Sequence, residues 1–374
     1  MKREPRTPRA DWQSKAEEVG FHFHSMDGVY WDESACYRFS AAEVDTLEAA
    51  TGELHERALE AVERIVSRRE YERFRIPEPF HALIERSWRD QDKSLYGRFD
   101  FSWDGRGEPK MLEYNADTPT ALLEASVMQW YWLQDVFPQY DQFNSLHEKL
   151  IERWKAMRGQ LPADGRVYFT CDAEAPEDQG TLDYLRDTAM QAEVKALAID
   201  IADIGWDGKR FVDIEERPIA ALFKLYPWEW LAREPFGQHL LARAAVMIEP
   251  AWKMLLSSKA ILPVLWEMFP GHPNLLAASF EEGAVAGDCV KKPLYSREGA
   301  NVSINAGGTT VEAPGDYGAE GFIWQAYHAL PRFEGAHTVI GSWIVGDEPA
   351  GIGIREDASP ITRNTSRFLP HYFA

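Results

Sequence analysis

The sequence predicts an α/β or α+β fold of the size of an enzyme, on the basis of three observations. A strand, a helix and a second strand alternate between residues 166 and 211, as is typical of an α/β unit. Two β-hairpins are expected, at residues 97–120 and 339–357. The chain of 374 residues is long enough to fold as two or three packed units around a large core.

Composition and charge restrict the class of ligand. The formal net charge is −20 and the pI is about 5.0, so we expect small-molecule substrates and neither nucleic acid nor an anionic membrane as main partner. The three cysteines form no CxxC motif, which argues against a disulfide scaffold or a zinc site and fits a reducing cytoplasm. The basic N-terminus leads into no apolar segment, and no run of 18 apolar residues occurs. A cytoplasmic protein that is not exported and does not span a membrane is therefore expected, with its oligomeric state left open.

The first part of the chain is expected to be a helical scaffold around the first hairpin. Apolar residues recur at helical spacing over residues 40–75, with acidic residues between them. Residues 120–132 predict a buried helix that leaves the hairpin, with Thr118 or Thr120 as its N-cap. Another helix is expected at residues 143–158.

The α/β unit follows. Residues 166–172 predict a strand, residues 180–193 a helix and residues 194–200 a second strand. Ligands of such units bind beyond the carboxyl ends of the strands, so Cys171 and Asp172 mark the expected ligand edge.

The last third of the chain carries further strands. One is predicted at residues 287–293, before a glycine-bearing loop at residues 295–308. An apolar stretch at residues 321–330 precedes the second hairpin, whose turn is expected at residues 346–351.

The first hairpin carries charged residues where strands usually carry Val, Ile or Thr. Alternate residues of a strand share a face, so Arg98 and Asp100 lie together, as do Glu113 and Asn115 on the return strand after a turn at residues 104–109. The opposite face is assigned Phe99, Phe101, Trp103, Leu112 and Tyr114.

These polar residues predict a magnesium site. Asp100, Glu113 and Asn115 offer the hard oxygen ligands that Mg²⁺ takes when substrate phosphates complete its octahedron. Arg98 would face those phosphates or another oxyanion. Without metal the carboxylates should repel one another, so Glu113→Gln is expected to leave folding intact. The alternative is a solvated face on which Arg98 pairs with Asp100 or Glu113.

A cationic segment provides candidates for binding phosphate. Lys291 and Lys292 alternate faces of a strand, so one can point at a ligand while its neighbour faces solvent. Arg297 and Gly299 follow in a loop whose backbone amides can approach phosphate closely. Lys259 lies in a helix-like run after two serines.

Five separated motifs occur in one order: RFD…LEYNAD, SSKAILPVLW, VKKPLYSREGANV, WQAYHALP and GSWIVGDEPAGIGIRED…ITRN. In order and spacing they resemble the synthetase domain of glutathionylspermidine synthase, from about residue 21 to the C-terminus. The resemblance implies an ATP-grasp fold with an associated pre-ATP-grasp-like α/β unit. It also implies a stand-alone acid–amine ligase, without the amidase domain that precedes the synthetase in the bifunctional enzyme.

The resemblance further implies one synthetase unit over residues 1–374. Its expected subregions are a helical scaffold with the metal-site hairpin (1–160), an α/β substrate-side unit (161–245), the ATP-grasp lid and hinge (246–335) and a C-terminal catalytic hairpin (336–374).

Carried over residue by residue, the resemblance assigns roles. Asp100, Glu113 and Asn115 become the Mg²⁺ ligands, and Arg98 steadies the transferring phosphoryl group and the substrate carboxylate. The residues assigned to ATP, four of which form a hinge along adenine, are Lys259, Lys292, Arg297, Glu298, Gln325, Ala326, Tyr327, His328, Arg355, Ile361, Thr362 and Arg363. The residues assigned to the substrates are Thr118, Thr120, Glu177 and Asp178.

The implied activity is an ATP- and Mg²⁺-dependent ligation of a carboxylate to an amine through an acyl phosphate. Thr118 and Thr120 stand where the family has two serines, so glutathionylspermidine synthesis is one version and the acid stays open. Two other classes are alternatives: a glycoside hydrolase that uses Asp100 and Glu113 among tryptophans, and an ATP-binding regulator without catalysis. Residues 228–230 line the acceptor pocket or, as aromatic residues more often do, belong to the core.

Overall fold

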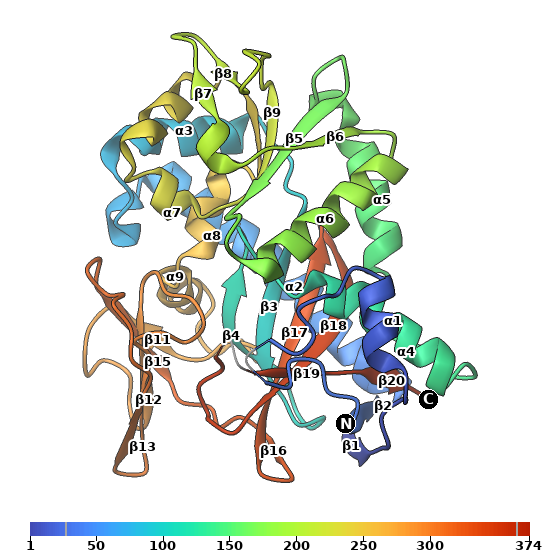
Figure 1. Cartoon of the computed structure of the whole chain (residues 1–374). Helices are drawn as coiled ribbons and strands as arrows, with labels where there is room; N and C mark the ends of the chain where they lie inside the picture. Colours follow the sequence, from blue (N-terminus) through green and yellow to red (C-terminus); the bar gives the residue numbers. More distant parts are fainter. Residues whose placement is uncertain (27, 364–365) are drawn as a thin grey trace.

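The computed structural model describes residues 1–26, 28–363 and 366–374. At its centre is an antiparallel sheet that contains both predicted hairpins (Figure 1). The strands lie in the order β19–β18–β17–β3–β4, and β16 pairs with β17. Their bounds are β3 Tyr96–Ser102, β4 Lys110–Asn115, β16 Arg332–Phe333, β17 Ala336–Val345, β18 Glu348–Asp357 and β19 Arg367–Leu369. Because β17 pairs with β3, the second hairpin lies directly beside the first.

A parallel sheet lies at the top of Figure 1. Its strand order is β10–β9–β5–β6, with β5 at Arg166–Cys171, β6 at Lys195–Ala198, β9 at Ala221–Leu225 and β10 at Val246–Ile248. The helix α6 (Pro176–Gln191) connects β5 to β6 and packs against α5 (Leu146–Met157). The strand, helix and strand predicted between residues 166 and 200 are therefore confirmed, although α6 begins before residue 180.

A second antiparallel sheet, orange in Figure 1, lies below the helix α9. Its order is β11–β15–β12–β13–β14, with bounds β11 Ala278–Ser279, β12 Cys289–Pro293, β13 Ser303–Ala306, β14 Thr309–Glu312 and β15 Phe322–Ala326. The strand predicted at residues 287–293 is confirmed as β12. The glycine-bearing loop between β12 and β13 faces the central sheet.

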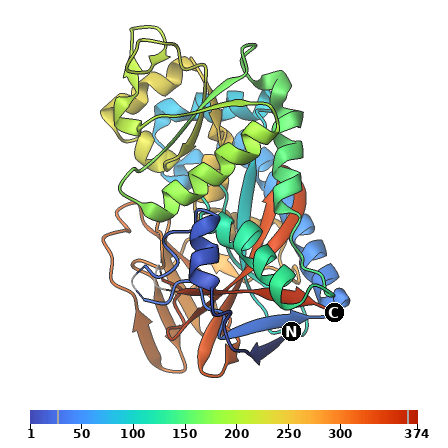
Figure 2. The same ribbon diagram turned by 45° about the vertical axis from the view of Figure 1, so that its right-hand side comes forward.

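The two chain ends meet in a small sheet. β2 (Ala35–Phe39) pairs antiparallel with β1 (Lys2–Pro5) and parallel with β20 (His371–Phe373). Both termini accordingly lie close together in the two views (Figures 1 and 2). The shortest pair of strands is β7 (Gly205–Trp206) with β8 (Phe211–Val212).

The predicted amphipathic scaffold is confirmed as α2 (Ala41–Arg68). Ser40 and Glu43 form a capping box at its start, and Arg69 ends it in the left-handed region at φ 57°. Its apolar face packs against β17, β18 and α9. The other helices are α1 Trp12–Glu18, α3 Glu78–Arg89, α4 Gln129–Val136, α7 Trp228–Leu231, α8 Met254–Ser257 and α9 Ile261–Met268. No helix within the described ranges is both long and apolar enough to cross a membrane.

The prediction of an N-cap at Thr118 or Thr120 is wrong. The chain turns at Ala121, whose φ is 69°, and a π-helical segment at Glu124–Met128 then leads into α4. The Thr120 carbonyl instead accepts a hydrogen bond from Arg98 Nη1 at 2.9 Å. Thr120 is therefore bound by Arg98 of the hairpin and does not cap the helix, although its residue type favours a helix start.

The turn of the second hairpin is also shorter than expected. Pairing of β17 with β18 continues to Val345 and Glu348, so only Gly346 and Asp347 form the turn. Gly346 has a φ of 60°, which a glycine adopts without strain. The extra pairing extends the central sheet by several residues.

Two buried ion pairs join the parallel sheet to the first hairpin. Lys224 Nζ on β9 lies 2.6 Å from Asp117 Oδ1, directly after β4, and each side chain is 1% exposed. Glu249, after β10, pairs with Lys253 at 2.9 Å and accepts a hydrogen bond from the Tyr96 amide at the start of β3. The two ends of the hairpin are thus fixed to the same unit by charge as well as by packing.

We expect Lys224→Met to lower the free energy of unfolding by about 3–5 kcal/mol, because the Asp117 carboxylate would remain buried without its partner. Urea denaturation measures the loss. The double variant Lys224→Met/Asp117→Leu, which buries no charge, should regain most of it. A double variant as unstable as the single one would mean that packing, not the ion pair, sets the loss.

Candidate active site

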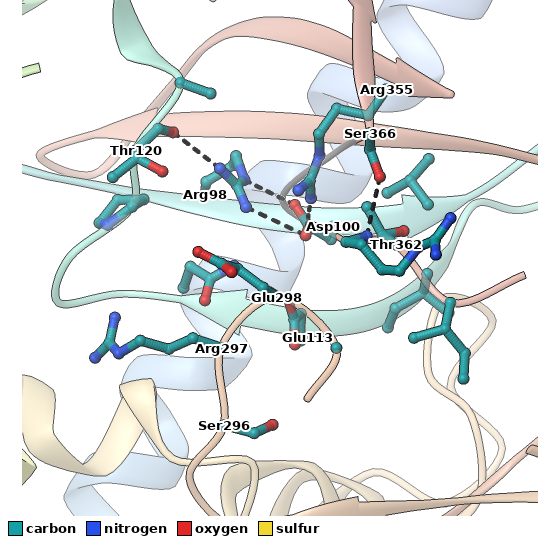
Figure 3. Close-up of a pocket in the computed structure, with 18 of the residues that line it drawn as sticks. Arg98, Asp100, Glu113, Thr120, Ser296, Arg297, Glu298, Arg355, Thr362 and Ser366 are labelled. Carbon is teal, nitrogen blue, oxygen red and sulfur yellow. Dashed lines mark hydrogen bonds and ion pairs between the residues drawn. The ribbon is translucent and has the colours of Figure 1, made fainter. Parts of the chain in front are cut away.

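A cavity of about 480 Å³ lies where the central sheet, the parallel sheet and the second antiparallel sheet meet (Figure 3). It is lined by every residue that the sequence analysis assigned to a site: Arg98, Asp100, Glu113, Asn115, Thr118, Thr120, Glu177, Asp178, Lys259, Lys292, Arg297, Glu298, Gln325, Ala326, Tyr327, His328, Arg355, Ile361, Thr362 and Arg363. The structure thus brings these residues together, while the role of each stays a prediction.

The predicted polar face of the first hairpin is confirmed. Arg98 pairs with Asn115 across the two strands, and Asp100 pairs with Glu113. All four side chains line the cavity. Directly paired residues of adjacent strands point to the same side of a sheet, so the register itself gathers the two carboxylates, the amide and the guanidinium.

The opposite face holds the hairpin in the core. The rings of Phe99 and Tyr114 stack with centroids 3.8 Å apart. Leu112, assigned to this face from the sequence, lies elsewhere because the register shifts before Phe101 and makes Leu112 the extra residue of a bulge. Leu112 lines the cavity, and its carbonyl accepts a hydrogen bond from Lys292 Nζ at 2.8 Å.

Asp100 is held between two guanidinium groups, as Figure 3 shows. Arg98 Nε lies 2.8 Å from Asp100 Oδ1, and Arg355 Nη2 on β18 lies 2.6 Å from Oδ2. Arg98 is 7% exposed. Burial lowers the pKa of Arg98, but Asp100 outweighs that effect and the pKa is raised. Arg98 therefore stays charged in a site that largely excludes water.

Glu113 lies between lysines. Lys259 Nζ approaches Glu113 Oε2 to 3.3 Å, and Asn115 Nδ2 donates to Oε1 at 3.2 Å. Burial raises the pKa of Glu113, but Lys259 and Lys292 lower it by more, so the carboxyl stays ionised. Burial lowers the pKa of Lys292 to about 8, against the attraction of Glu113. Lys292 Nζ also donates a hydrogen bond to Gln325 Oε1 at 2.7 Å. A buried ammonium group of this kind is suited to binding an anion.

The expectation that the metal-free carboxylates repel one another is therefore wrong. Asp100 and Glu113 face each other across the strands, but each has cationic partners of its own. The alternative of Arg98 paired with Asp100 is present in the structure, yet within a cavity and not on a solvated face. Position in the sequence does not show which lysine and arginine side chains lie against the hairpin in the folded chain.

The predictions for the three lysines have different outcomes. Lys292 enters the cavity, while Lys291 lies on the other side of β12 with Nζ 4.2 Å from the Phe322 ring centroid, as alternation predicts. Lys259 does not lie in a helix; it occupies the turn between α8 and α9, where its amide donates to the Leu294 carbonyl at 2.9 Å. The turn directs its side chain to Glu113.

An apolar wall closes the lower end of the cavity. Val290, Val302, Ile304 and Ile361 are buried together, and Tyr327 packs against them. The sequence analysis assigned only Ile361 and Tyr327 to the site. For Val290, Val302 and Ile304, the sequence signal was that alternate residues along β12 and β13 share a face. The wall can hold a flat, apolar ligand group next to Lys292.

A third arginine, Arg297, lies at the other end of the cavity. Arg297, in the loop after β12, donates to Thr118 Oγ1 at 2.8 Å and to Glu229 Oε1 at 2.9 Å. Its guanidinium lies 5.3 Å from the Trp230 ring centroid. Trp230 lines the cavity, whereas Trp228 is 1% exposed and belongs to the core. Trp228 therefore fits the core alternative for residues 228–230, whereas an acceptor pocket at Trp230 stays a prediction.

The same end carries an excess of carboxylates. Glu177 and Asp178 in the first turn of α6 line the cavity with Asp172 and Glu298. Burial, followed by the charge of Glu177, raises the pKa of Asp178 to about 7 and raises the pKa of Glu298. Crowded carboxylates of this kind favour a cation in their midst.

A contacting pair, Tyr30 and Glu124, was also missed from the sequence. Tyr30 lines the cavity from the loop before β2. Its hydroxyl donates to Glu124 Oε1 at 2.6 Å. The available signal was a single charged residue, Glu124, in the run LLEASVM.

The residues present fit a magnesium ion. Asp100, Glu113 and Asn115 provide oxygen donors from paired positions beside a cationic cavity. The described residues contain no group of three or more His, Cys, Asp or Glu that could hold a metal by itself. Two carboxylates and an amide suit an ion that takes its remaining ligands from a substrate.

Comparisons with known proteins agree over the whole chain. The family model "Glutathionylspermidine synthase preATP-grasp" matches residues 3–374. A "Putative acid--amine ligase" of Haemophilus influenzae is 43% identical, over 98% of this chain and 97% of its own length. Trypanothione synthetase of Crithidia fasciculata is 29% identical, over 84% of this chain and 53% of its own. The bifunctional glutathionylspermidine synthetase/amidase of Escherichia coli is 26% identical, over 89% and 58%.

A solved structure supports the fold. The apo form of a glutathione synthetase-like effector from Globodera pallida superposes with a TM-score of 0.53 at 12% identity, over 97% of this chain and 96% of its own. The chain spans about half the length of the two larger synthetases, but nearly all of the Haemophilus relative.

We expect Glu113→Gln to lower the free energy of unfolding at pH 7 by roughly 1–3 kcal/mol, because Lys259 and Lys292 lose their shared carboxylate. The lowered pKa of Glu113 means that its stabilisation is present above the ordinary carboxyl pKa and is lost as the pH falls further. The difference between parent and variant should therefore shrink below about pH 4.5. Denaturation at pH 7 and pH 4 measures it; a variant as stable as the parent at pH 7 would restore the view that repulsion dominates.

Proposed function

The chain belongs to the glutathionylspermidine synthase preATP-grasp family, and on that premise we propose that it is an ATP-dependent ligase that joins a carboxylate to an amine. One observation carries the proposal beyond family membership. A single cavity holds an apolar wall, a group of buried cations and a group of crowded carboxylates. These are the environments that a nucleotide base, its phosphates and a cationic amine require.

We assign the apolar wall to the adenine ring. Ala326, at the end of β15, and Tyr327, directly after it, line the cavity, and Gln325 is buried beside them. Lys259 and Lys292 would neutralise the phosphates. Binding of phosphate would displace Lys259 from Glu113 and free that carboxylate for a metal.

The proposed metal site is Asp100, Glu113 and Asn115. When bound there, Mg²⁺ would neutralise the phosphate charge and hold the phosphate oxygens in place. Arg98 and Arg355 stand directly beside Asp100 and can receive charge that develops on the phosphoryl group during its transfer.

The proposed chemistry runs through an acyl phosphate. The substrate carboxylate attacks the terminal phosphorus of ATP, and ADP leaves. The amine then attacks the acyl carbon, the C–N bond forms, and phosphate leaves with the electron pair of the C–O bond. Arg98 holds both reacting groups with its planar fork, and the carboxylates at Glu177 and Asp178 hold the amine by charge.

Family membership also bears on which carboxylic acid is the substrate. Glutathionylspermidine synthesis, the activity named for the Escherichia coli relative, is the specific version for which family membership argues. Thr118 and Thr120 narrow the pocket where the resemblance places serines. The glycosidase alternative loses support, because Glu113 is kept ionised and no carboxylic acid lies beside Asp100 to protonate a leaving group.

Mg·ATP should raise the melting temperature of the parent protein by mass action; at 100 times the Kd the gain is about 2.7 kcal/mol. Lys292→Met should remove most of that shift. Its neighbour Lys291, which points out of the cavity, provides the matched control: Lys291→Met should keep the shift. No shift in the parent at millimolar Mg·ATP would contradict nucleotide binding.

Hydroxylamine should intercept the acyl phosphate. With Mg·ATP, hydroxylamine and a panel of carboxylic acids that includes glutathione, the parent should form a hydroxamate and ADP for the correct acid. Arg98→Lys should reduce that rate by about 10²-fold or more, because one ammonium cannot replace the two-pronged contact. Release of AMP and pyrophosphate would show adenylation and overturn the acyl phosphate.

A further inference from the structure

A carboxyl group that the proposed chemistry does not use lies behind the cavity wall. Glu124 is 1% exposed, on the π-helical segment that leads into α4, among apolar residues. Its Oε1 accepts the Tyr30 hydroxyl at 2.6 Å. Its Oε2 has no hydrogen-bond partner among the described residues. A buried carboxyl with one oxygen unsatisfied costs stability, so its retention needs a reason.

Tyr30 connects this carboxyl to the cavity. The ring is 2% exposed and is held in place by edge contacts with Phe21 and Phe23 and by Phe368. Tyr30 nevertheless lines the cavity, beside Glu177. The tyrosine is thus a fixed bridge, with Glu124 at one side of its hydroxyl and the carboxylate end of the cavity at the other.

Two charged groups, one from α6 and one from β3, act on Glu124. Burial, then the negative charge of Glu177 on α6, raise its pKa to about 8; the hydrogen bond from Tyr30 and the charge of Arg98 on β3 oppose that rise. Burial and the two glutamates also raise the pKa of Tyr30. A cation that arrives beside Glu177 would cancel the repulsion and shift Glu124 towards its ionised form.

An amine needs such a group. An alkylamine has a pKa of about 10.4, like the lysine side chain, and reaches the site as an ammonium ion without a lone pair. It must lose one proton before it can attack the acyl phosphate. In the proposed function the carboxylates of Glu177 and Asp178 bind the ammonium ion. A proton transferred only to one of these carboxylates would remain beside the reacting nitrogen.

We propose that Tyr30 and Glu124 form a proton relay that deprotonates the amine substrate, an inference that rests on the proposed function. The ammonium proton passes to the Tyr30 oxygen as the Tyr30 proton passes to Glu124 Oε1. The products are a neutral amine, an intact tyrosine and a carboxylic acid. The amine lone pair then forms the C–N bond, and the departing phosphate takes the second nitrogen proton. Tyr30 touches the substrate, and Glu124 acts through it.

Two nucleophiles distinguish the relay from a structural hydrogen bond. Hydroxylamine is largely neutral at pH 7.5 and attacks without prior deprotonation, whereas spermidine is cationic. With Mg·ATP and glutathione as the probe acid, Tyr30→Phe and Glu124→Gln should lower spermidine-dependent amide formation by about 10²-fold or more, the range of general base catalysis, while hydroxamate formation keeps the parent rate. Equal loss of both products, or loss of neither, would overturn the relay and leave the ligase function standing.

A matched control lies outside the cavity. Tyr37 donates to Glu356 at 2.5 Å in a second buried tyrosine–glutamate pair. Tyr37→Phe should cost stability but keep the parent ratio of amide to hydroxamate. A changed ratio in this variant would show that the ratio reports general disturbance, and would overturn the inference.

A binding measurement covers the case in which glutathione is not the acid. Calorimetric titration of spermidine at pH 7 in two buffers of different ionisation enthalpy counts protons. The parent and Tyr37→Phe should release more protons on binding than Glu124→Gln, which keeps only the release from Asp178, whose pKa burial and Glu177 raise to about 7. Equal release by parent and Glu124→Gln would overturn the relay alone. No spermidine binding to the parent would remove the amine site, and with it both the relay and the amine half of the proposed function.

Discussion

The pairing of Asp100 with Glu113 across the first hairpin is the constraint on which the site depends. Alternation places charge on one side of the two strands and the stacked Phe99 and Tyr114 on the other. The hydrophobic effect acts on the aromatic side, and the charged side is buried as a consequence. Arg98, Arg355 and Lys259 compensate these carboxylates, which would otherwise lie unpaired in a site with little water.

The cations come from distant parts of the chain. Arg355 reaches Asp100 from β18, and Lys259 reaches Glu113 from the turn between α8 and α9. These pairs neutralise the two carboxylates, and the same side chains are the ones proposed to bind phosphate. A ligand that brings its own negative charge and a metal would exchange partners with little net loss of charge compensation. The proposed phosphate site is thus preorganised by its internal carboxylates.

The opposite end of the cavity follows a different rule. Glu177 and Asp178 crowd together with Glu298, and the raised pKa of Asp178 records that the group lacks a sufficient cation of its own. The charge of Arg297 opposes the rise in the pKa of Asp178 and of Glu298 only in part, and its guanidinium also binds Glu229 and Thr118. The proposed amine would supply the missing charge. The Lys224–Asp117 pair, directly before Thr118, fixes the distance between this end and the hairpin.

The sequence by itself determined the α/β class, the α6 unit, the polar face of the hairpin and the placement of Lys291 and Lys292 on opposite faces of a strand, because alternation and helical periodicity are local properties of the chain. The order of motifs, through the family resemblance, named the residues that line one cavity. Only the tertiary structure decided the partners of the carboxylates, the bulge at Leu112, the turn that holds Lys259 and the contact of Tyr30 with Glu124. Those features depend on which distant segments approach each other and on the need to neutralise buried charge. Neither can be read from the spacing of residues that are neighbours in the sequence.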